Sequence, residues 1–135
     1  MKLVVHVDGG ARGNPGPAAA AAVLSDAAGG QTVDEATEYL GHTTNNVAEY
    51  RALLLGLARA AALGADAVEI VNDSELVAKQ VNGEYKVKHP DMKLLHTQAL
   101  EALAGFDAWV VRTVPRSKNA DADALVNQAL DAARE

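Results

Sequence analysis

The sequence predicts an α/β fold in which helices flank one mixed β-sheet. Short apolar runs rich in β-branched residues alternate with longer segments whose leucines and alanines recur at helical spacing. Clusters of glycine, proline and asparagine separate the two kinds of segment. The resulting order of elements is β-β-β-α-β-α-α-β-α, which favours a mixed sheet with helices packed on it.

Five segments have the composition of strands. The first is a β-branched run that stops at Asp8, Gly9 and Gly10, as expected of a buried central strand. A turn rich in glycine and proline is predicted over residues 9–17. The second and third strands flank the glycine-bearing residues 26–30 and are expected to form a hairpin beside the first strand, although the alanine run in the second would alone suggest a helix. The predicted strands are residues 3–7, 18–24, 31–40, 68–71 and 109–114.

Four segments are predicted to be helical. The first is expected to end at Gly64, because glycine commonly follows the last helical residue. The second and third are joined by a lysine-bearing connection that ends at Pro90. The predicted helices are residues 46–63, 74–81, 92–103 and 120–133. Because no repeat or linker divides the sequence, residues 1–135 are expected to form a single domain.

Four acidic residues stand at the ends of separate predicted elements. Asp8 ends a strand, Asp73 lies between a strand and a helix, and Glu49 and Asp123 lie early in helices. Each has turn or amide residues beside it, so each is placed where the ends of elements converge. Clustered carboxylates repel one another unless cations neutralise them, and hard oxygen ligands select Mg²⁺ or Mn²⁺. The sequence therefore indicates a divalent-metal site.

Each of these acids also has an ordinary structural explanation. Asp8 could begin a turn, and Glu49 could complete a capping box with Asn46. Asp73 could cap the helix that follows it, and Asp123 could favour the dipole of its own helix. For each residue taken singly both explanations stay open. The four acids taken together favour the catalytic one.

The four acids lie within four longer motifs. These are DGGARGNPGP at residues 8–17, TNNVAEY at 44–50, NDSELV at 72–77 and VPRSKNADADAL at 114–125. In order and spacing the motifs resemble type 1 ribonuclease H, the prokaryotic ribonuclease HI family, over essentially the whole chain. The resemblance implies a ribonuclease H-like fold with a five-stranded mixed sheet and the acids at the carboxyl ends of central strands. It also implies hydrolysis of the RNA strand of RNA–DNA hybrids with two Mg²⁺ or Mn²⁺ ions in the active site.

The resemblance assigns a role to each acid. Asp8 would bridge both ions. Glu49 and Asp73 would hold the ion on the side of the nucleophile, together with the substrate, and Asp123 would complete the shell of the other ion. Asp121 is the rival for this last role, but it lies about 200° around the same helix, so the two cannot both point into the site. The Asp-x-Leu pattern that begins at Asp123 matches the family, so Asp123 is predicted to be the ligand.

The resemblance also implies contacts with the substrate. The residues at the positions that read the 2′-hydroxyl of RNA are Gly10, Asn14, Asn45, Asn46 and Glu49. Asn14 and Thr44 match a pocket that grips a phosphate of the DNA strand, with Arg12 beside it, and Lys118 is expected to contact the substrate from the loop before the last helix. The alternative for the segment around Asn14 is a plain turn.

The sequence departs from the family pattern at two places. Many members carry a histidine in the loop before the last helix, where this chain has Arg116. Arginine does not deprotonate in a protein, so Arg116 can contact phosphate or stabilise charge but cannot act as a general base; the alternative is a solvated loop residue. The other departure is the segment 81–90, which is too short for the basic, tryptophan-bearing protrusion of many members. The single tryptophan, Trp109, lies in a predicted strand and is expected to pack in the core.

Composition and charge limit the remaining possibilities. The chain has no cysteine, which excludes disulfides and thiolate metal sites. Its net charge of -6 argues against a nucleic-acid partner, but two divalent ions would neutralise four of those charges, and the segment 79–93 carries a local excess of lysine. The lysines of that segment are Lys79, Lys86, Lys88 and Lys93. No apolar run approaches the roughly 20 residues of a membrane span, and Met1 leads directly into a strand, so a cytoplasmic monomer without membrane contact is expected.

Two rival functions are kept beside hybrid cleavage. One is a different nuclease of the ribonuclease H fold, such as an exonuclease or a resolvase. The other is a hybrid-binding module with weak or no catalysis, which would be expected to lack one of the carboxylates. Double-stranded RNA stays open as an additional substrate. The four histidines show no zinc-like pairing and are expected to be structural or surface residues; they are His6, His42, His89 and His96.

Overall fold

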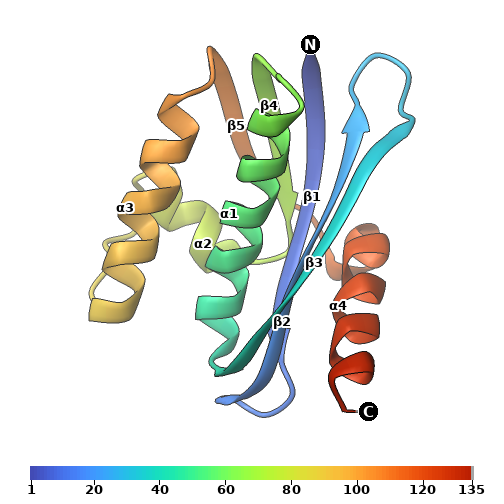
Figure 1. Ribbon diagram of the computed structural model, residues 1–135. Helices are drawn as coiled ribbons and strands as arrows, with labels where there is room; N and C mark the ends of the chain where they lie inside the picture. The colour runs from blue at the N-terminus through green and yellow to red at the C-terminus, as the bar shows by residue number, and fades with distance from the viewer. Residues whose placement is uncertain (135) are drawn as a thin grey trace.

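A five-stranded mixed sheet forms the centre of the molecule in the computed structural model, which describes residues 1–134 (Figure 1). Glu135, the last residue of the expected domain, lies outside the described residues. The strand order is β3-β2-β1-β4-β5. The β3–β2 and β2–β1 pairs are antiparallel, and the β1–β4 and β4–β5 pairs are parallel. The strands are β1 (Lys2–Ala11), β2 (Gly16–Asp26), β3 (Thr32–Thr43), β4 (Ala67–Asn72) and β5 (Ala108–Thr113). The predicted fold class is confirmed.

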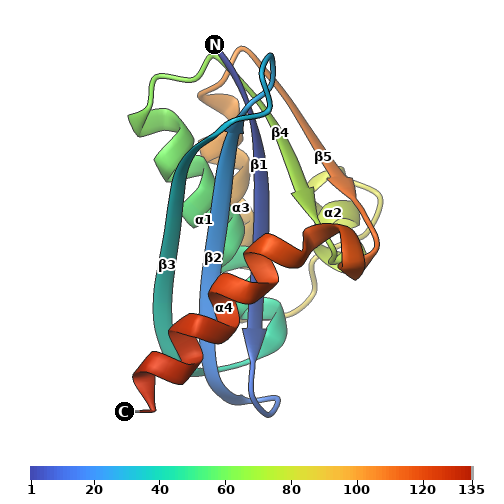
Figure 2. The ribbon, with the colours of Figure 1, turned by 90° about the vertical axis from the view of Figure 1, so that its right-hand side faces the viewer.

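The helices are divided unequally between the two faces of the sheet. The first three lie on one face and the last crosses the other (Figures 1 and 2). They are α1 (Asn45–Ala62), α2 (Glu75–Val81), α3 (Pro90–Ala104) and α4 (Ala120–Ala133), and a short 3-10 helix η1 (Arg116–Asn119) leads into α4. Within the described part of the chain, none of these helices is long and apolar enough to cross a bilayer.

Strand β2 explains how one sheet accepts helices so closely on both faces. Its alanines Ala18 to Ala22 are fully buried. Ala20 and Ala22 face the large core under α1, whereas Ala19 and Ala21 face α4. Because side chains alternate along a strand, a run of small residues lowers both faces at once and lets helices approach. The helical tendency of alanine is therefore overridden by tertiary packing, as the hairpin prediction required.

The boundary of the first strand differs from the prediction. Strand β1 does not stop at Asp8 but runs on to Ala11, because Gly9, Gly10 and Ala11 pair with β2. The predicted turn over residues 9–17 is correspondingly shorter. Asp8 therefore lies inside a paired strand, and the interpretation that it begins a turn is wrong.

The helix ends are set by local hydrogen bonds. Thr44 caps α1 by accepting a hydrogen bond from the Val47 amide, and Gly64 follows the end of α1 with φ +79°, as predicted for a glycine in that position. Ser74, not Asp73, caps α2 by accepting from the Val77 amide. The capping alternatives for Glu49 and Asp73 are therefore not realised, and both carboxylates are left for another role.

The main core lies between the sheet and α1 to α3 and contains one buried polar link. The Tyr50 hydroxyl donates to Gln80 Oε1 over 2.6 Å and so ties α1 to α2. Burial raises the pKa of Tyr50 to about 12, which keeps the donor protonated. His96 contacts the backbone oxygen of Gln80 at 3.0 Å, consistent with its expected structural role. Trp109 is half-buried and packs against this core, as expected.

We expect Tyr50→Phe to destabilise the fold by about 1–3 kcal/mol, because Gln80 Oε1 would lose its buried donor. Tyr39 offers a matched control, since the residue is 50% exposed and Tyr39→Phe should change stability by less than about 0.5 kcal/mol. Urea denaturation of the two variants and the wild type measures both values. Equal stabilities for all three proteins would contradict the importance of this link.

Candidate active site

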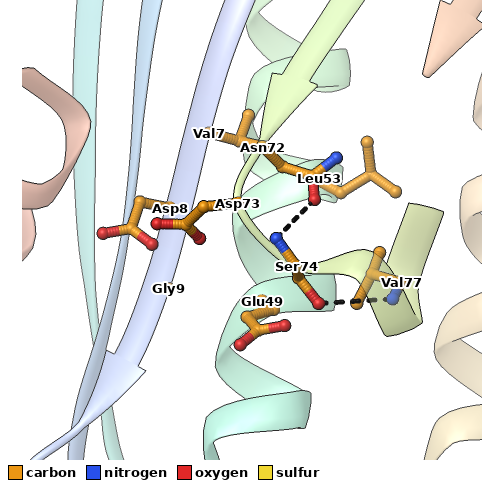
Figure 3. Close-up of a pocket in the computed structure, with 9 residues that line it drawn as sticks. All are labelled: Val7, Asp8, Gly9, Glu49, Leu53, Asn72, Asp73, Ser74 and Val77. Carbon is orange, nitrogen blue, oxygen red and sulfur yellow. Dashed lines mark hydrogen bonds between the residues drawn. The ribbon is translucent and has the colours of Figure 1, made fainter. Parts of the chain in front are cut away.

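Two neighbouring parallel strands bring the first pair of carboxylates together. In the register between β1 and β4, His6 lies opposite Val71. Continuing that register by two residues places Asp8 level with Asp73, which directly follows the end of β4. Figure 3 shows the two carboxylates side by side. The expectation that the acids lie at the carboxyl ends of central strands holds for Asp73, whereas Asp8 lies three residues before the end of β1.

A close contact between backbones adds the third carboxylate. A Cβ atom on Gly9 would overlap the carbonyl group of Ala48, so only glycine allows β1 and α1 to approach this closely. The contact places Glu49, the next residue on α1, beside the other two acids (Figure 3). Asp8, Glu49 and Asp73 line one small cavity with about 10 Å³ of space for the centre of a water molecule. Such a volume accommodates about one water molecule or ion.

The fourth carboxylate comes from the opposite face of the sheet. Asp123 lies in the first turn of α4 and comes within hydrogen-bonding reach of Asp8. Asp121, its rival in the sequence, interacts instead with His6 and lines a different, larger cavity. The structure therefore brings Asp123, and not Asp121, to Asp8.

Burial and mutual repulsion dominate the electrostatics of the cluster. Asp8 is only 9% exposed, and burial together with the negative charges of Asp73 and Asp123 raises its pKa to about 8. Burial also raises the pKa of Glu49, with a further contribution from Asp73, although a hydrogen bond from Ser74 acts in the opposite direction. The Oε2 atom of Glu49 is buried and has no hydrogen-bond partner.

These features fit a divalent cation. A buried carboxylate oxygen without a donor is costly, and a cation would both coordinate it and reduce the repulsion between its neighbours. All four side chains supply hard oxygen ligands, which suit Mg²⁺ or Mn²⁺. Among residues 1–134, no group of three or more His, Asp or Glu side chains already has an arrangement that would hold an ion.

A buried asparagine fixes the start of α4. Asn119 is 1% exposed, and its side-chain amide donates to the Val7 carbonyl over 2.9 Å. This bond joins the end of η1 to the strand that carries Asp8 and so helps to place Asp123, four residues later. The sequence offered only an asparagine before a helix, which is typical of a turn, so its anchoring role was missed.

The predicted substrate residues gather where the β1–β2 turn meets α1. Asn45 accepts a hydrogen bond from the Ala11 amide at 2.8 Å, and its own backbone amide donates to Asn14 Oδ1 at 3.0 Å. Asn14, Thr44 and Asn46 line a shallow groove that continues to the start of α3. Gly10 lies beneath them in β1, close to Val126 of α4.

The remaining predicted site residues are more dispersed. Arg116 is 80% exposed in its side chain, and its guanidinium lies 3.5 Å from Asp123 Oδ1. Lys118 does not line the acidic cavity but the neighbouring one that also contains Asp121. Arg12 points to α4 rather than into the groove, with its guanidinium 2.8 Å from Asp131 Oδ1.

Comparisons with known proteins identify the family to which this sheet and its clustered carboxylates belong. The family model described as reverse transcriptase-like matches residues 6–129. The chain is 47% identical over 130 residues to the ribonuclease HI of Halobacterium salinarum, covering 96% of this chain and 65% of that protein. It is also 46% identical over 133 residues to a bifunctional protein of Mycobacterium tuberculosis, covering 98% of this chain and 36% of that protein.

Solved structures extend the comparison to three dimensions. The N-terminal ribonuclease H domain of the M. tuberculosis protein superposes with a TM-score of 0.95 at 45% identity, covering 99% of this chain and 96% of that one. A ribonuclease H1 named LC11, crystallised with an RNA/DNA hybrid, gives a TM-score of 0.92 at 42% identity, covering 98% and 99%. The chain belongs to the type 1 ribonuclease H family. It spans about a third to two thirds of the length of the two curated relatives.

The raised pKa of Asp8 predicts a pH dependence of stability for the metal-free protein. Because the folded value of about 8 lies above the ordinary value of 3.8, the folded state holds this proton more tightly than the unfolded state. The stabilisation is therefore complete below about pH 4 and is lost as the pH rises through about 8. Asp8→Asn cannot ionise, so with EDTA at pH 8 it should be at least as stable as the wild type.

Urea denaturation with EDTA between about pH 5 and pH 9 measures this difference. Asp107→Asn, at an exposed position, should keep the pH dependence of the wild type. If the stability difference between wild type and Asp8→Asn does not change with pH, the folded pKa of Asp8 is not raised.

Proposed function

We propose that this protein is an endoribonuclease that hydrolyses the RNA strand of RNA–DNA hybrids. The observation that carries the proposal is the gathering of Asp8, Glu49, Asp73 and Asp123 from four separate elements at the centre of the sheet. The LC11 ribonuclease H1, whose crystal structure holds an RNA/DNA hybrid, supports the choice of substrate because it matches 98% of this chain.

The four carboxylates would hold two Mg²⁺ or Mn²⁺ ions. Asp8 interacts with both Asp73 and Asp123, which suits it to a place between the ions. Glu49 interacts with Asp73 and shares a cavity with it, so these two would hold one ion. Asp123 would hold the other from the α4 side. Divalent ions, when bound, lower the pKa of a coordinated water for attack on phosphorus and neutralise the charge of the leaving oxygen.

The chain's own groups would orient the RNA strand. The Asn14 and Asn45 side-chain oxygens are already occupied by backbone amides, which leaves their amide NH₂ groups to donate to substrate. Asn45, Asn46 and the backbone of Gly10 would read the 2′-hydroxyl beside Glu49. Asn14 and Thr44, which share one groove, would grip a phosphate of the DNA strand.

Positive side chains would complete the hold on the duplex. Lys86 and Lys88 line a shallow groove with Tyr85 on the connection between α2 and α3. Their charges would contact the phosphate backbone without reading sequence. Lys118, which lines the cavity beside Asp121 and not the acidic cavity, would contact a phosphate outside the reacting centre.

Arg116 would act by its charge. Its guanidinium lies beside Asp123 and remains largely exposed, so it can turn toward a phosphate near the cleaved bond. Because it keeps its proton, it would stabilise negative charge or ease departure of the product rather than move a proton.

Several properties stay predictions. Residues 1–135 are proposed to act as a single ribonuclease H domain and as a monomer. Double-stranded RNA as a further substrate and a cytoplasmic location also stay predictions. Sedimentation of the protein alone would test the monomeric state. Cleavage assays on double-stranded RNA would test that substrate.

Cleavage of a labelled RNA–DNA hybrid tests the function. We expect cuts within the RNA strand with Mg²⁺ or Mn²⁺ and none with EDTA. Asp123→Asn should lower the rate by at least about 100-fold, because it removes a proposed ion ligand, whereas Asp121→Asn should stay within about tenfold of wild type. Binding of the hybrid without cleavage would favour the binding-module rival, and cuts only from strand ends would favour an exonuclease. Greater damage by Asp121→Asn would reverse the assignment on α4.

Arg116 gives a separate prediction. Arg116→Ala should slow turnover of the hybrid by about 10-fold without abolishing it, because the proposed ion ligands are untouched. Arg116→Lys should recover part of the loss, since it keeps the charge but not the planar fork. Steady-state rates for the three proteins on one hybrid decide the matter. Indistinguishable rates would make Arg116 a solvated loop residue.

A further inference from the structure

Arg12, which directly follows β1, makes side-chain contacts with two residues of α4. One guanidinium nitrogen lies 2.8 Å from Asp131 Oδ1 on α4. The other lies 3.4 Å from the side-chain oxygen of Asn127 and 3.5 Å from its backbone oxygen. The side chain therefore spans from the turn after β1 to the middle and end of α4.

The partners of Arg12 lie on the same face of α4 as Asp123. Asp123, Asn127 and Asp131 are four residues apart, the spacing that aligns side chains along one face of a helix. Asn127 also donates from its side chain to the Asp123 carbonyl at 3.1 Å. A continuous path of contacts thus leads from Arg12 to the residue that carries the fourth carboxylate.

Two contacts between charged side chains link β1, and the residue that directly follows it, to helix α4. In one contact Asp8 meets Asp123, and in the other Arg12 meets Asp131. Four strand residues span about 13 Å and eight helical residues about 12 Å, so the two contacts are nearly equally spaced on the two elements. The first contact sets two carboxylates against each other, whereas the second pairs opposite charges.

The packing beneath α4 is small. Its buried cluster consists of Ala19, Ala21, Val126 and Leu130, whereas the core under the other helices extends over most of the sheet. When both are ionised, Asp8 and Asp123 repel each other at the end of α4 that begins at the site. An attractive contact eight residues along the same face opposes displacement of the helix from β1.

We propose that Arg12 is a positioning residue, which through Asn127 and Asp131 holds α4 where Asp123 meets Asp8. The inference rests on the proposed nuclease function and changes the role expected for Arg12. A guanidinium occupied by Asp131 and Asn127 acts on the metal ligand Asp123, not on a phosphate of the DNA strand. Its loss should therefore affect turnover and metal binding more than affinity for the hybrid.

Exchanging the charges of Arg12 and Asp131 distinguishes a positioning role of Arg12 from phosphate binding. The variants are Arg12→Glu, Asp131→Arg and the double variant with both changes. Each single change sets like charges against each other and should lower kcat by about tenfold, with KM for the hybrid within about twofold of wild type. The double variant restores an opposite-charge pair and should recover most of the lost kcat.

Two further readouts do not depend on cleavage. Hydrogen exchange of the α4 amides in the metal-free protein should be faster in each single variant and return toward the wild-type rate in the double variant. Calorimetric titration with Mn²⁺ should show weaker binding in the single variants and recovery in the double. Unchanged exchange in β1 and α1 would show that the rest of the fold is intact.

Arg59 provides the matched control. It makes a comparable ion pair with Asp34 at 2.7 Å, joining α1 to β3 far from α4. Arg59→Glu should leave kcat, metal binding and α4 exchange unchanged.

Other outcomes would overturn the inference. A higher KM for Arg12→Glu that persists in the double variant, with no effect of Asp131→Arg on kcat, would return Arg12 to phosphate binding. Wild-type values for all three variants would make the contact a surface ion pair without consequence. A wild-type protein that does not cut hybrids would refute the proposed function, and the α4 exchange would still show whether Arg12 holds the helix.

Discussion

Four carboxylates crowded into a partly buried place are the constraint on which the rest of the structure depends. Burial disfavours every charge in the cluster, and each charge disfavours its neighbours, as the raised pKa of Asp8 shows. The fold must therefore hold the acids by contacts that the acids themselves do not make. Gly9 packs against Ala48 and Asn119 bonds to the Val7 carbonyl, and neither contact depends on the state of a carboxylate. The supports of the four acids therefore do not depend on a bound cation.

These supports are distributed unequally. The elements that carry Asp8, Glu49 and Asp73 share the large core, in which α1 packs directly on β1 and β2. Asp123 comes from α4, whose buried cluster holds only two valine- or leucine-sized side chains, Val126 and Leu130. Local stability follows the density of buried apolar contacts, so α4 is the part of the site that opens most easily. A cation bound between Asp8 and Asp123 would therefore also hold α4 in place against β1.

The fold class and most elements could be predicted because their signals are local. Periodicity and caps place α1 and α4 within a residue of their observed bounds, and Gly64 ends α1 as expected. The missed features depend on partners that lie outside the local segment. The extension of β1 through Ala11 needs its pairing with β2, because a Gly-rich segment alone predicts a turn. The bonds of Asn119 and Arg12 reach residues more than 100 positions away, and no local pattern announces them.

The distribution of ion pairs reconciles an acidic chain with the proposed nucleic-acid substrate, which is also acidic. Arg51, Arg59 and Arg112 are each engaged by a carboxylate on a neighbouring strand, so their charges are neutralised within the fold. In the described part of the chain, Lys86 and Lys88 are not engaged in this way, and they follow α2, which begins two residues after Asp73. Although the net charge is -6, the connection that follows α2 carries a local excess of lysine. Such exposed charges attract phosphates only over about 10 Å at moderate salt, so they would hold a duplex whose reacting strand already lies at the carboxylates. Affinity for the proposed substrate then depends on the positions of the lysines that no carboxylate engages, and the net charge of the whole protein matters little.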